Sequence, residues 1–152
     1  MSRKSKRTVQ QVREVLDAVV AEDPDRRDRR AAAGVQGGSR YVEQGHCACL
    51  ASEILHRLGF SLGRLKTLDT AADGDPIHLS GSDLAVYFEP LAFELLIFLQ
   101  NKNDQGWTWS RVRQDALSIS DFWAHHPKYR YRGKEWLAET PALNALEYKD
   151  AT

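Results

Sequence analysis

Six apolar residues between positions 47 and 58 recur at the spacing of a helix. They are Cys47, Leu50, Ala51, Ile54, Leu55 and Leu58. Offsets of three and four residues place all six on one face of an α-helix, which has about 3.6 residues per turn. Gly59 follows at a position where a glycine commonly closes a helix, because its φ can be positive. The pattern predicts a helix with one buried face.

Further helices are predicted where a capping residue precedes an apolar run. Thr8, Ser61, Thr108 and Ser120 can each cap a helix, and Pro90 suits a first helical turn. The run that follows Pro90, to about Lys102, is apolar on nearly all sides, so it predicts the central helix. Residues 77–88 fit either a short strand or another helix start. The expected fold class is all-α, a compact single domain of five or six helices with room for a minor short β hairpin.

Composition divides the 152 residues into three segments around one domain. Residues 1–7 are basic and predict a disordered arm. Residues 8–123 carry the helical domain, in which residues 22–40 form a charged loop or linker that could hold a short helix over Arg26–Ala33. Residues 124–152 form an aromatic and basic tail, which either packs on the domain or extends from it.

The charges balance at 21 basic and 21 acidic residues, so no overall field steers the chain to nucleic acid or to a membrane. Two cysteines so close together are too few for a disulfide framework. No apolar stretch of a signal peptide follows the basic N-terminus. The most apolar run, Leu91–Leu99, is too short to span a membrane and contains Glu94. We therefore expect a cytoplasmic protein without a membrane partner, and the sequence leaves its oligomeric state open.

His46, Cys47 and Cys49 stand at the expected start of the helix. A thiolate at a helix N-terminus is stabilised by the macrodipole, so a lowered pKa would make either cysteine a reactive thiol. The alternative is that Cys47, on the apolar stripe, belongs to the core. Cys49 lies about 200° round the helix from it, which predicts the more exposed thiol. His56 is two turns further on, and Cys-x-Cys is tighter than the usual zinc spacing, so no metal motif is complete.

The aromatic and basic tail is a second candidate site. Tyr129 and Tyr131 alternate with Arg130 and Arg132, and Trp136 follows. Rings that stack on bases beside cations that meet phosphates are what single-stranded nucleic acid requires. The same alternation also fits a docked arm with its rings inward and its arginines in solvent.

Three further tryptophans are candidate contacts with a protein. Trp107, Trp109 and Trp123 can pack over the core or lie partly exposed, and exposed tryptophans are favoured interface residues. Asp104, in the turn before Trp107, could act as a general base, but a lone carboxylate there is more often structural.

The chain resembles one group of proteins. The pattern consists of Tyr41, Gly45, Cys47, Leu50, Leu55, Leu58 and Gly59, then a hydrophobic helix, Asn103-Asp104 and Trp109. Over roughly residues 41–117 it resembles a domain of unknown function found in small helical proteins of actinobacteria and their phages. The second cysteine, the arginine-rich insert before Tyr41 and the aromatic tail depart from that pattern. The resemblance implies a compact helical fold and a mobile-element origin, and it implies no activity, cofactor or catalytic residue.

Three functions follow from these features, in order of preference. The first is a non-enzymatic interaction module without a cofactor, an accessory protein of a phage or plasmid that binds a host protein. The second is a nucleic-acid-binding protein that uses its basic and aromatic terminal segments, with binding that weakens as salt rises. The third is a thiol- or zinc-dependent enzyme built around His46, Cys47 and Cys49.

Overall fold

A computed structural model describes residues 6–28, 40–70 and 76–126 of the chain. Within these residues it contains five α-helices, two 3-10 helices and one two-stranded sheet. In chain order they are α1 (Val9–Glu22), β1 (Val42–Glu43), β2 (His46–Cys47), α3 (Leu50–Arg57), α4 (Leu62–Asp69), η1 (Leu79–Gly81), η2 (Asp83–Tyr87), α5 (Pro90–Asn103) and α6 (Trp109–His125). The predicted all-α fold with a minor hairpin is confirmed.

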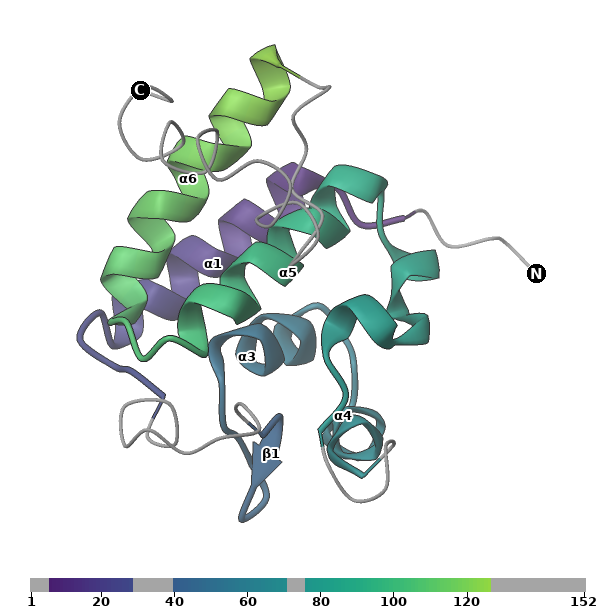
Figure 1. Cartoon of the computed structure of the whole chain (residues 1–152). Coiled ribbons are helices and arrows are strands. Elements are labelled where there is room, and N and C mark those ends of the chain that lie inside the picture. Colours follow the sequence, from purple (N-terminus) through teal and green to yellow (C-terminus); the bar gives the residue numbers. More distant parts are fainter. Residues whose placement is uncertain (1–5, 29–39, 71–75, 127–152) are drawn as a thin grey trace.

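Helix α5 is the centre of the domain. It contacts α1, α3 and α6, and Figure 1 shows α1, α5 and α6 running side by side, with α3, α4 and the hairpin below them. Ten of its 14 residues are buried, as an all-round apolar sequence predicts. Pro90 occupies the first turn, where its missing N–H would have no helical partner in any case.

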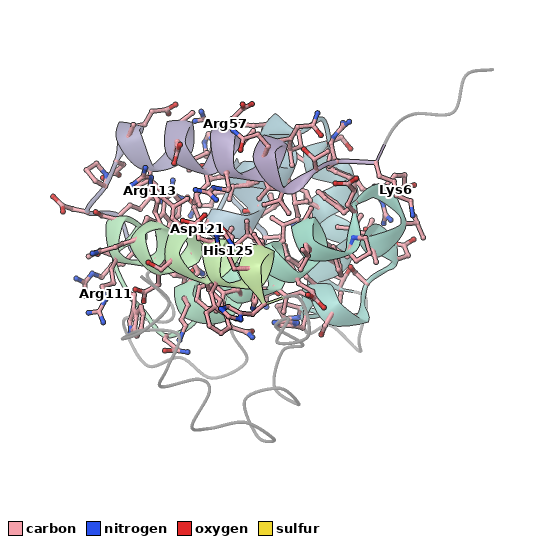
Figure 2. The ribbon with its side chains drawn as sticks, turned by 90° about the horizontal axis from the view of Figure 1, so that it is seen from above. Lys6, Arg57, Arg111, Arg113, Asp121 and His125 are labelled. Carbon is pink, nitrogen blue, oxygen red and sulfur yellow. The ribbon has the colours of Figure 1, made fainter. Side chains whose placement is uncertain are left out.

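Ion pairs tie the outer faces of α1 and α6 together. Arg13 on α1 lies 2.7 Å from Asp121 on α6, and Arg113 on α6 lies 2.7 Å from Asp17 on α1. Figure 2 shows Arg113 and Asp121 along the line where the two helices meet. Exposed pairs of this kind add only about 0–1 kcal/mol each, so the buried apolar faces hold the helices together.

The predicted helix caps are confirmed at Thr8, Ser61 and Thr108. Each side-chain oxygen accepts a hydrogen bond from the backbone N–H three residues on, at 3.1, 3.1 and 3.4 Å. Such a bond satisfies one of the four N–H groups that the first turn of a helix leaves unpaired.

The start of α3 differs from the prediction. The helix begins at Leu50 rather than Cys47, because residues 42–47 form an antiparallel hairpin that pairs Val42 with Cys47. Gln44 and Gly45 have φ values of 52° and 78°, as a tight two-residue hairpin turn requires. The apolar face of the helix is as predicted, and Gly59, with φ of 109°, closes it.

One other sequence interpretation needs correction, and one open alternative is decided. Ser120 does not start a new helix, because Trp109, Val112, Ala116, Ile119 and Trp123 form one buried stripe along a continuous α6. The Ser120 hydroxyl donates to the carbonyl of Leu117 within that helix, at 3.1 Å. Of the two alternatives left open for residues 77–88, the helix start is confirmed, because Ser82 caps η2 and its hydroxyl accepts from the N–H of Leu84 at 3.3 Å.

The basic arm and the linker are described only in part. Arg7 belongs to the domain, since its backbone pairs with Phe88 in a parallel bridge, whereas residues 1–5 lie outside the described residues. A short helix is expected over Arg26–Ala33. Residues 26–28 of this range are not helical, and residues 29–33 lie outside the described residues.

Candidate functional site

The two cysteines lie where β2 leads into α3, and both are buried. Cys47 is 8% exposed and Cys49 only 1%. The prediction that Cys49 is the more exposed thiol is therefore wrong. It assumed that both residues stand on the helix, whereas Cys49 is the extended residue before it and points into the core.

Both thiols are stabilised in the protonated form. Desolvation by burial raises the pKa of Cys47, and the carboxylate of Glu53 raises it further. Burial raises the pKa of Cys49 to about 12, although hydrogen bonds from Ser52 act in the opposite direction. The expected lowering by the helix N-terminus is outweighed, because removal of a thiolate from water costs more than the helix dipole returns.

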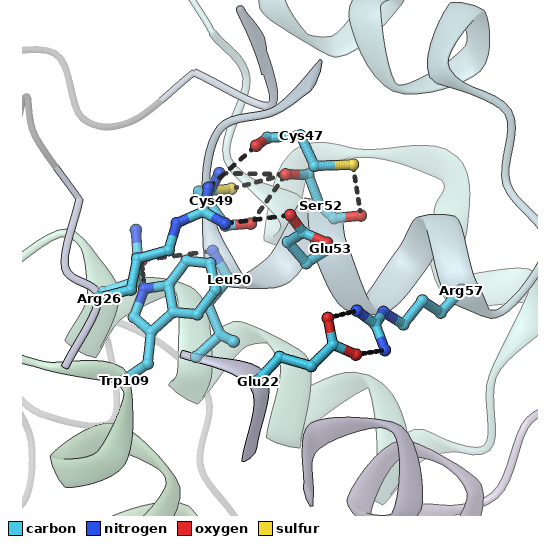
Figure 3. Close-up of polar contacts among 10 residues, drawn as sticks. Glu22, Arg26, Cys47, Cys49, Leu50, Ser52, Glu53, Arg57 and Trp109 are labelled. Carbon is cyan, nitrogen blue, oxygen red and sulfur yellow. Dashed lines mark hydrogen bonds and ion pairs between the residues drawn. The ribbon is translucent and has the colours of Figure 1, made fainter. Parts of the chain in front are cut away.

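Arg26 closes the surface over this junction (Figure 3). Its guanidinium donates to Glu53 and to the carbonyl of Cys47, both at 3.1 Å, and stacks 4.1 Å from the centre of the Trp109 ring. The backbone N–H of Trp109 in turn donates to the backbone carbonyl of Arg26 at 2.7 Å. Arg26 is therefore a structural clamp between the α6 start and α3, rather than a cation available to activate a thiol.

Buried polar side chains nearby support the backbone. Asn103 accepts hydrogen bonds from the N–H of Leu50 at 3.3 Å and from the Trp109 indole at 3.0 Å. Asp69 accepts from the backbone N–H groups of Tyr41 and Val42, at 2.7 and 3.0 Å. Each hydrogen bond satisfies a donor that would otherwise be buried without a partner. Asn103 therefore joins α5 to the starts of α3 and α6, and Asp69 joins α4 to β1.

A polar network around Tyr41 joins α5 to η1. The Tyr41 hydroxyl donates to the carbonyl of Ile77 and accepts from Gln100, both at 2.6 Å, while Gln100 accepts from the N–H of Leu79 at 3.0 Å. Burial raises the pKa of Tyr41, so its hydroxyl stays protonated. Asp104, the residue considered as a general base, is the C-cap of α5 and lies 3.4 Å from the Asn103 amide.

The two histidines nearest to the cysteines in the sequence lie at opposite ends of α3. His46 is exposed on the hairpin, and the His56 ring lies 2.9 Å from the carbonyl of Phe60 at the other end of α3. Within the residues that the structure describes, no group of three or more His, Cys, Asp and Glu side chains is arranged to hold a metal ion.

Two of the three tryptophans considered as contact residues belong to the core, and the third is partly exposed. Trp109 and Trp123 are both 1% exposed and belong to the core. Trp107 is half-buried, and its ring lies 4.8 Å from the Lys102 ammonium and 4.5 Å from the Arg111 guanidinium. These contacts hold the turn between α5 and α6.

The candidate residues of the tail lie beyond the described part of the chain. They are Tyr129, Arg130, Tyr131, Arg132 and Trp136. The nucleic-acid interpretation depends on them, so it stays a prediction.

The exposed apolar surface lies instead at the C-terminal end of α3. Val86 is 64% and Tyr87 50% exposed, and they are the large hydrophobic residues that stand out from the described surface. Beside them is a cavity of about 150 Å³, which we call the α3–η2 groove. It is lined by Lys6, Arg7, Leu58, Gly59, Phe60, Val86 and Tyr87.

The sequence pattern does not predict this surface. Val86 and Tyr87 lie in the stretch 77–88, whose structure the pattern left open, and Phe60 follows a helix end. The adjacent apolar residues Ala85 to Phe88 were the available signal, but an apolar run alone does not say which of its residues face the core.

A second cavity, of about 460 Å³, lies between residues 23–28 and the hairpin. It is lined by Asp23, Arg26, Arg27, Asp28, Glu43, Gln44, His46, Cys47 and Ala48. Charges of both signs alternate there, so the lining does not select one class of ligand.

No protein-family model, curated protein or solved structure matches this chain. Among the described residues, none of the helices is long and apolar enough to span a membrane.

Proposed function

We propose that this protein is a non-enzymatic interaction module that binds another protein through the α3–η2 groove. The observation that carries the proposal is the exposure of Val86 and Tyr87 beside an apolar hollow. Single exposed hydrophobic residues are common on protein surfaces, but two adjacent ones next to a cavity form a patch of the kind found at interfaces.

Burial of these side chains would supply binding energy. Transfer of a large apolar side chain from water into a packed interface is worth about 1.5–3 kcal/mol. Tyr87 also has the ring and hydroxyl that interface cores favour, and it meets Phe60 edge to face at 5.5 Å. The packed rings of Phe60 and Tyr87 form an apolar surface that a partner can contact.

The state of the cysteines supports binding rather than catalysis. The thiols of Cys47 and Cys49 are free, buried and protonated, so they serve the core. Unpaired core cysteines are usual in a reducing compartment, which supports a cytoplasmic location. We propose further that the protein is an accessory factor of a phage or plasmid with a host protein as partner, which stays an expectation from the sequence.

Affinity capture from an actinobacterial lysate tests the proposal. The full chain is compared with Val86→Asp, which places a carboxylate in the patch, and with Gln10→Asp, which places the same group on the exposed face of α1. Nuclease treatment removes proteins held through nucleic acid. The proposal expects a protein that the wild type and Gln10→Asp retain and Val86→Asp loses. Equal retention by all three would overturn it.

A further inference from the structure

We propose that the α3–η2 groove binds an acidic peptide segment, with one apolar side chain of the peptide inserted into the hollow beside Phe60 and Val86. This inference rests on the proposed function and specifies the chemistry of the partner. It depends on the size of the hollow, on the rigidity of its walls and on the charges at its rim.

The hollow has room for one side chain. Its volume is about 150 Å³, and Leu58, Phe60, Val86 and Tyr87 supply its apolar walls. An apolar cavity of about this size can hold a benzene-sized group. A leucine or phenylalanine side chain of a partner therefore fits, whereas a whole helix does not.

The walls come from three segments that hydrogen bonds hold together. The N–H of Arg7 donates to the carbonyl of Tyr87, and the N–H of Glu89 donates to the carbonyl of Arg7, both at 2.9 Å. The Arg7 guanidinium donates to the carbonyl of Leu58 at 2.6 Å, at the end of α3. A pre-formed pocket loses little conformational entropy on binding, which favours the insertion of a single anchor.

Gly59 lines the groove at the end of α3, and its backbone conformation favours glycine. Its φ of 109° is one that side chains rarely tolerate, and a Cβ there would lie 3.6 Å from the Arg7 guanidinium. A glycine at this position lets the chain turn out of α3 and leaves Arg7 next to the hollow.

The rim is basic. Lys6 and Arg7 both line the groove, and neither has a carboxylate partner within the described residues. Figure 2 shows Lys6 where the chain enters the domain, far from Arg111 and Arg113 at the other end of the molecule. Carboxylates on a partner would meet these cations and set the orientation of the segment.

A second hollow extends the same surface. It has a volume of about 400 Å³ and is lined by Lys6, Ser80, Ala85, Phe88, Pro90, Phe93, Glu94 and Ile97. Glu94 makes this second hollow unsuitable for a carboxylate, so the acidic residues of the peptide belong at Lys6 and only an apolar side chain belongs in the hollow. Because Lys6 borders both hollows, a peptide that crosses Lys6 can place a second apolar side chain there. Acidic residues between two apolar ones are therefore the pattern that the surface fits best.

Phage display of short random peptides on the full-length protein tests the inference without assuming a sequence. Peptides are selected on the wild type and counter-selected on Val86→Asp, whose fold is checked by circular dichroism. We expect the groove-dependent peptides to be acidic and to carry a leucine or an aromatic residue. Groove-dependent peptides that are neutral or basic would overturn the inference and leave the proposed function standing.

The affinity of the best peptide is then measured for two charge-reversal variants, one at the rim of the groove and one outside it. Lys6→Glu should weaken binding by at least about tenfold, and the loss should shrink as NaCl rises, because exposed charges are screened. Lys66→Glu makes the same charge change on the exposed face of α4 and should leave the affinity nearly unchanged. Equal losses in both variants would contradict the inference.

A second copy of the chain is the competing occupant of the groove. Sedimentation equilibrium that shows a wild-type dimer, dissociated by Val86→Asp, would assign the groove to self-association and overturn the acidic-peptide inference. A monomer at all concentrations, with groove-dependent acidic peptides, would support it. If neither the peptides nor the lysate capture depends on Val86, the proposed function itself fails.

Discussion

The two ends of helix α3 differ in what they leave to solvent. At its N-terminal end both thiols hydrogen-bond to Ser52, and Arg26 donates to the carbonyl of Cys47. We call this the closed end because both thiols are buried, although Arg26 and Cys47 also border the polar cavity of about 460 Å³. At its C-terminal end Leu58 and Gly59 open onto a groove beside the exposed Val86. The thiols of Cys47 and Cys49 are thus buried in the structure, whereas the apolar side chains of Val86 and Tyr87 are accessible to a partner.

The largest effect should come from Trp109, which completes the closed end. Trp109→Ala removes a buried ring on which Arg26 stacks and should lower the free energy of unfolding by about 3–5 kcal/mol. Trp107→Ala, at a half-buried ring, should cost clearly less. Urea denaturation measures both. Equal losses would mean that the junction is no more tightly packed than the surface.

Asn103 comes next, because its side chain satisfies two buried donors. Asn103→Ala leaves the N–H of Leu50 and the Trp109 indole without this acceptor and should cost about 2–3 kcal/mol. Asn101→Ala, which removes the hydrogen bond to the half-buried His78, is the matched control. A loss at Asn103 no larger than at Asn101 would sink the view that the closed end depends on polar satisfaction.

The buried thiol predicts how stability changes with pH. The thiol of Cys49 has a pKa of about 12 in the fold, whereas an unfolded cysteine ionises near pH 8.5. The unfolded state therefore loses its proton first, so the stabilisation is complete below about pH 8.5 and is lost as pH rises toward 12. Between pH 8.5 and 10.5 the wild type should lose about 2 kcal/mol more than Cys49→Ala. Parallel pH profiles from denaturant titrations would show that the thiolate is tolerated.

Substitution at the C-terminal end of α3 should change the free energy of unfolding far less than substitution at the closed end. Val86→Asp changes a residue that is 64% exposed, so it should shift the free energy of unfolding by no more than about 0.5 kcal/mol. A thermal melt checks this value. A large loss would mean that Val86 supports the fold, and the contrast between the two ends would disappear.

The fold could be predicted from the sequence wherever a local signal decided it. The caps at Thr8, Ser61 and Thr108, the all-round apolar α5 and the stripe that begins at Leu50 each have a short-range physical cause. The start of α3 could not be predicted in the same way. Cys47 fits the helical stripe, but the hairpin turn at Gln44 and Gly45 takes it into a strand.

The site was harder to predict because exposure depends on tertiary packing. Trp109 and Trp123 have the chemistry of interface residues, yet their helix turns them into the core. Cys49 is buried because the chain is extended before it enters α3, which helical spacing does not reveal. Tyr87 and Phe88 are neighbours of similar type, but one is half exposed and the other 1% exposed. Only the placement of Arg7 and Phe60 around them shows which side faces solvent.

Site-specific photocrosslinking in cells tests the central claim most directly. A photoreactive amino acid replaces Val86 in one variant and Lys66, on the exposed face of α4, in another. The account predicts that irradiation joins a partner protein to position 86 and leaves position 66 unmodified. Adducts at position 66 alone, or the same adducts at both positions, would contradict the claim that the α3–η2 groove is the functional surface.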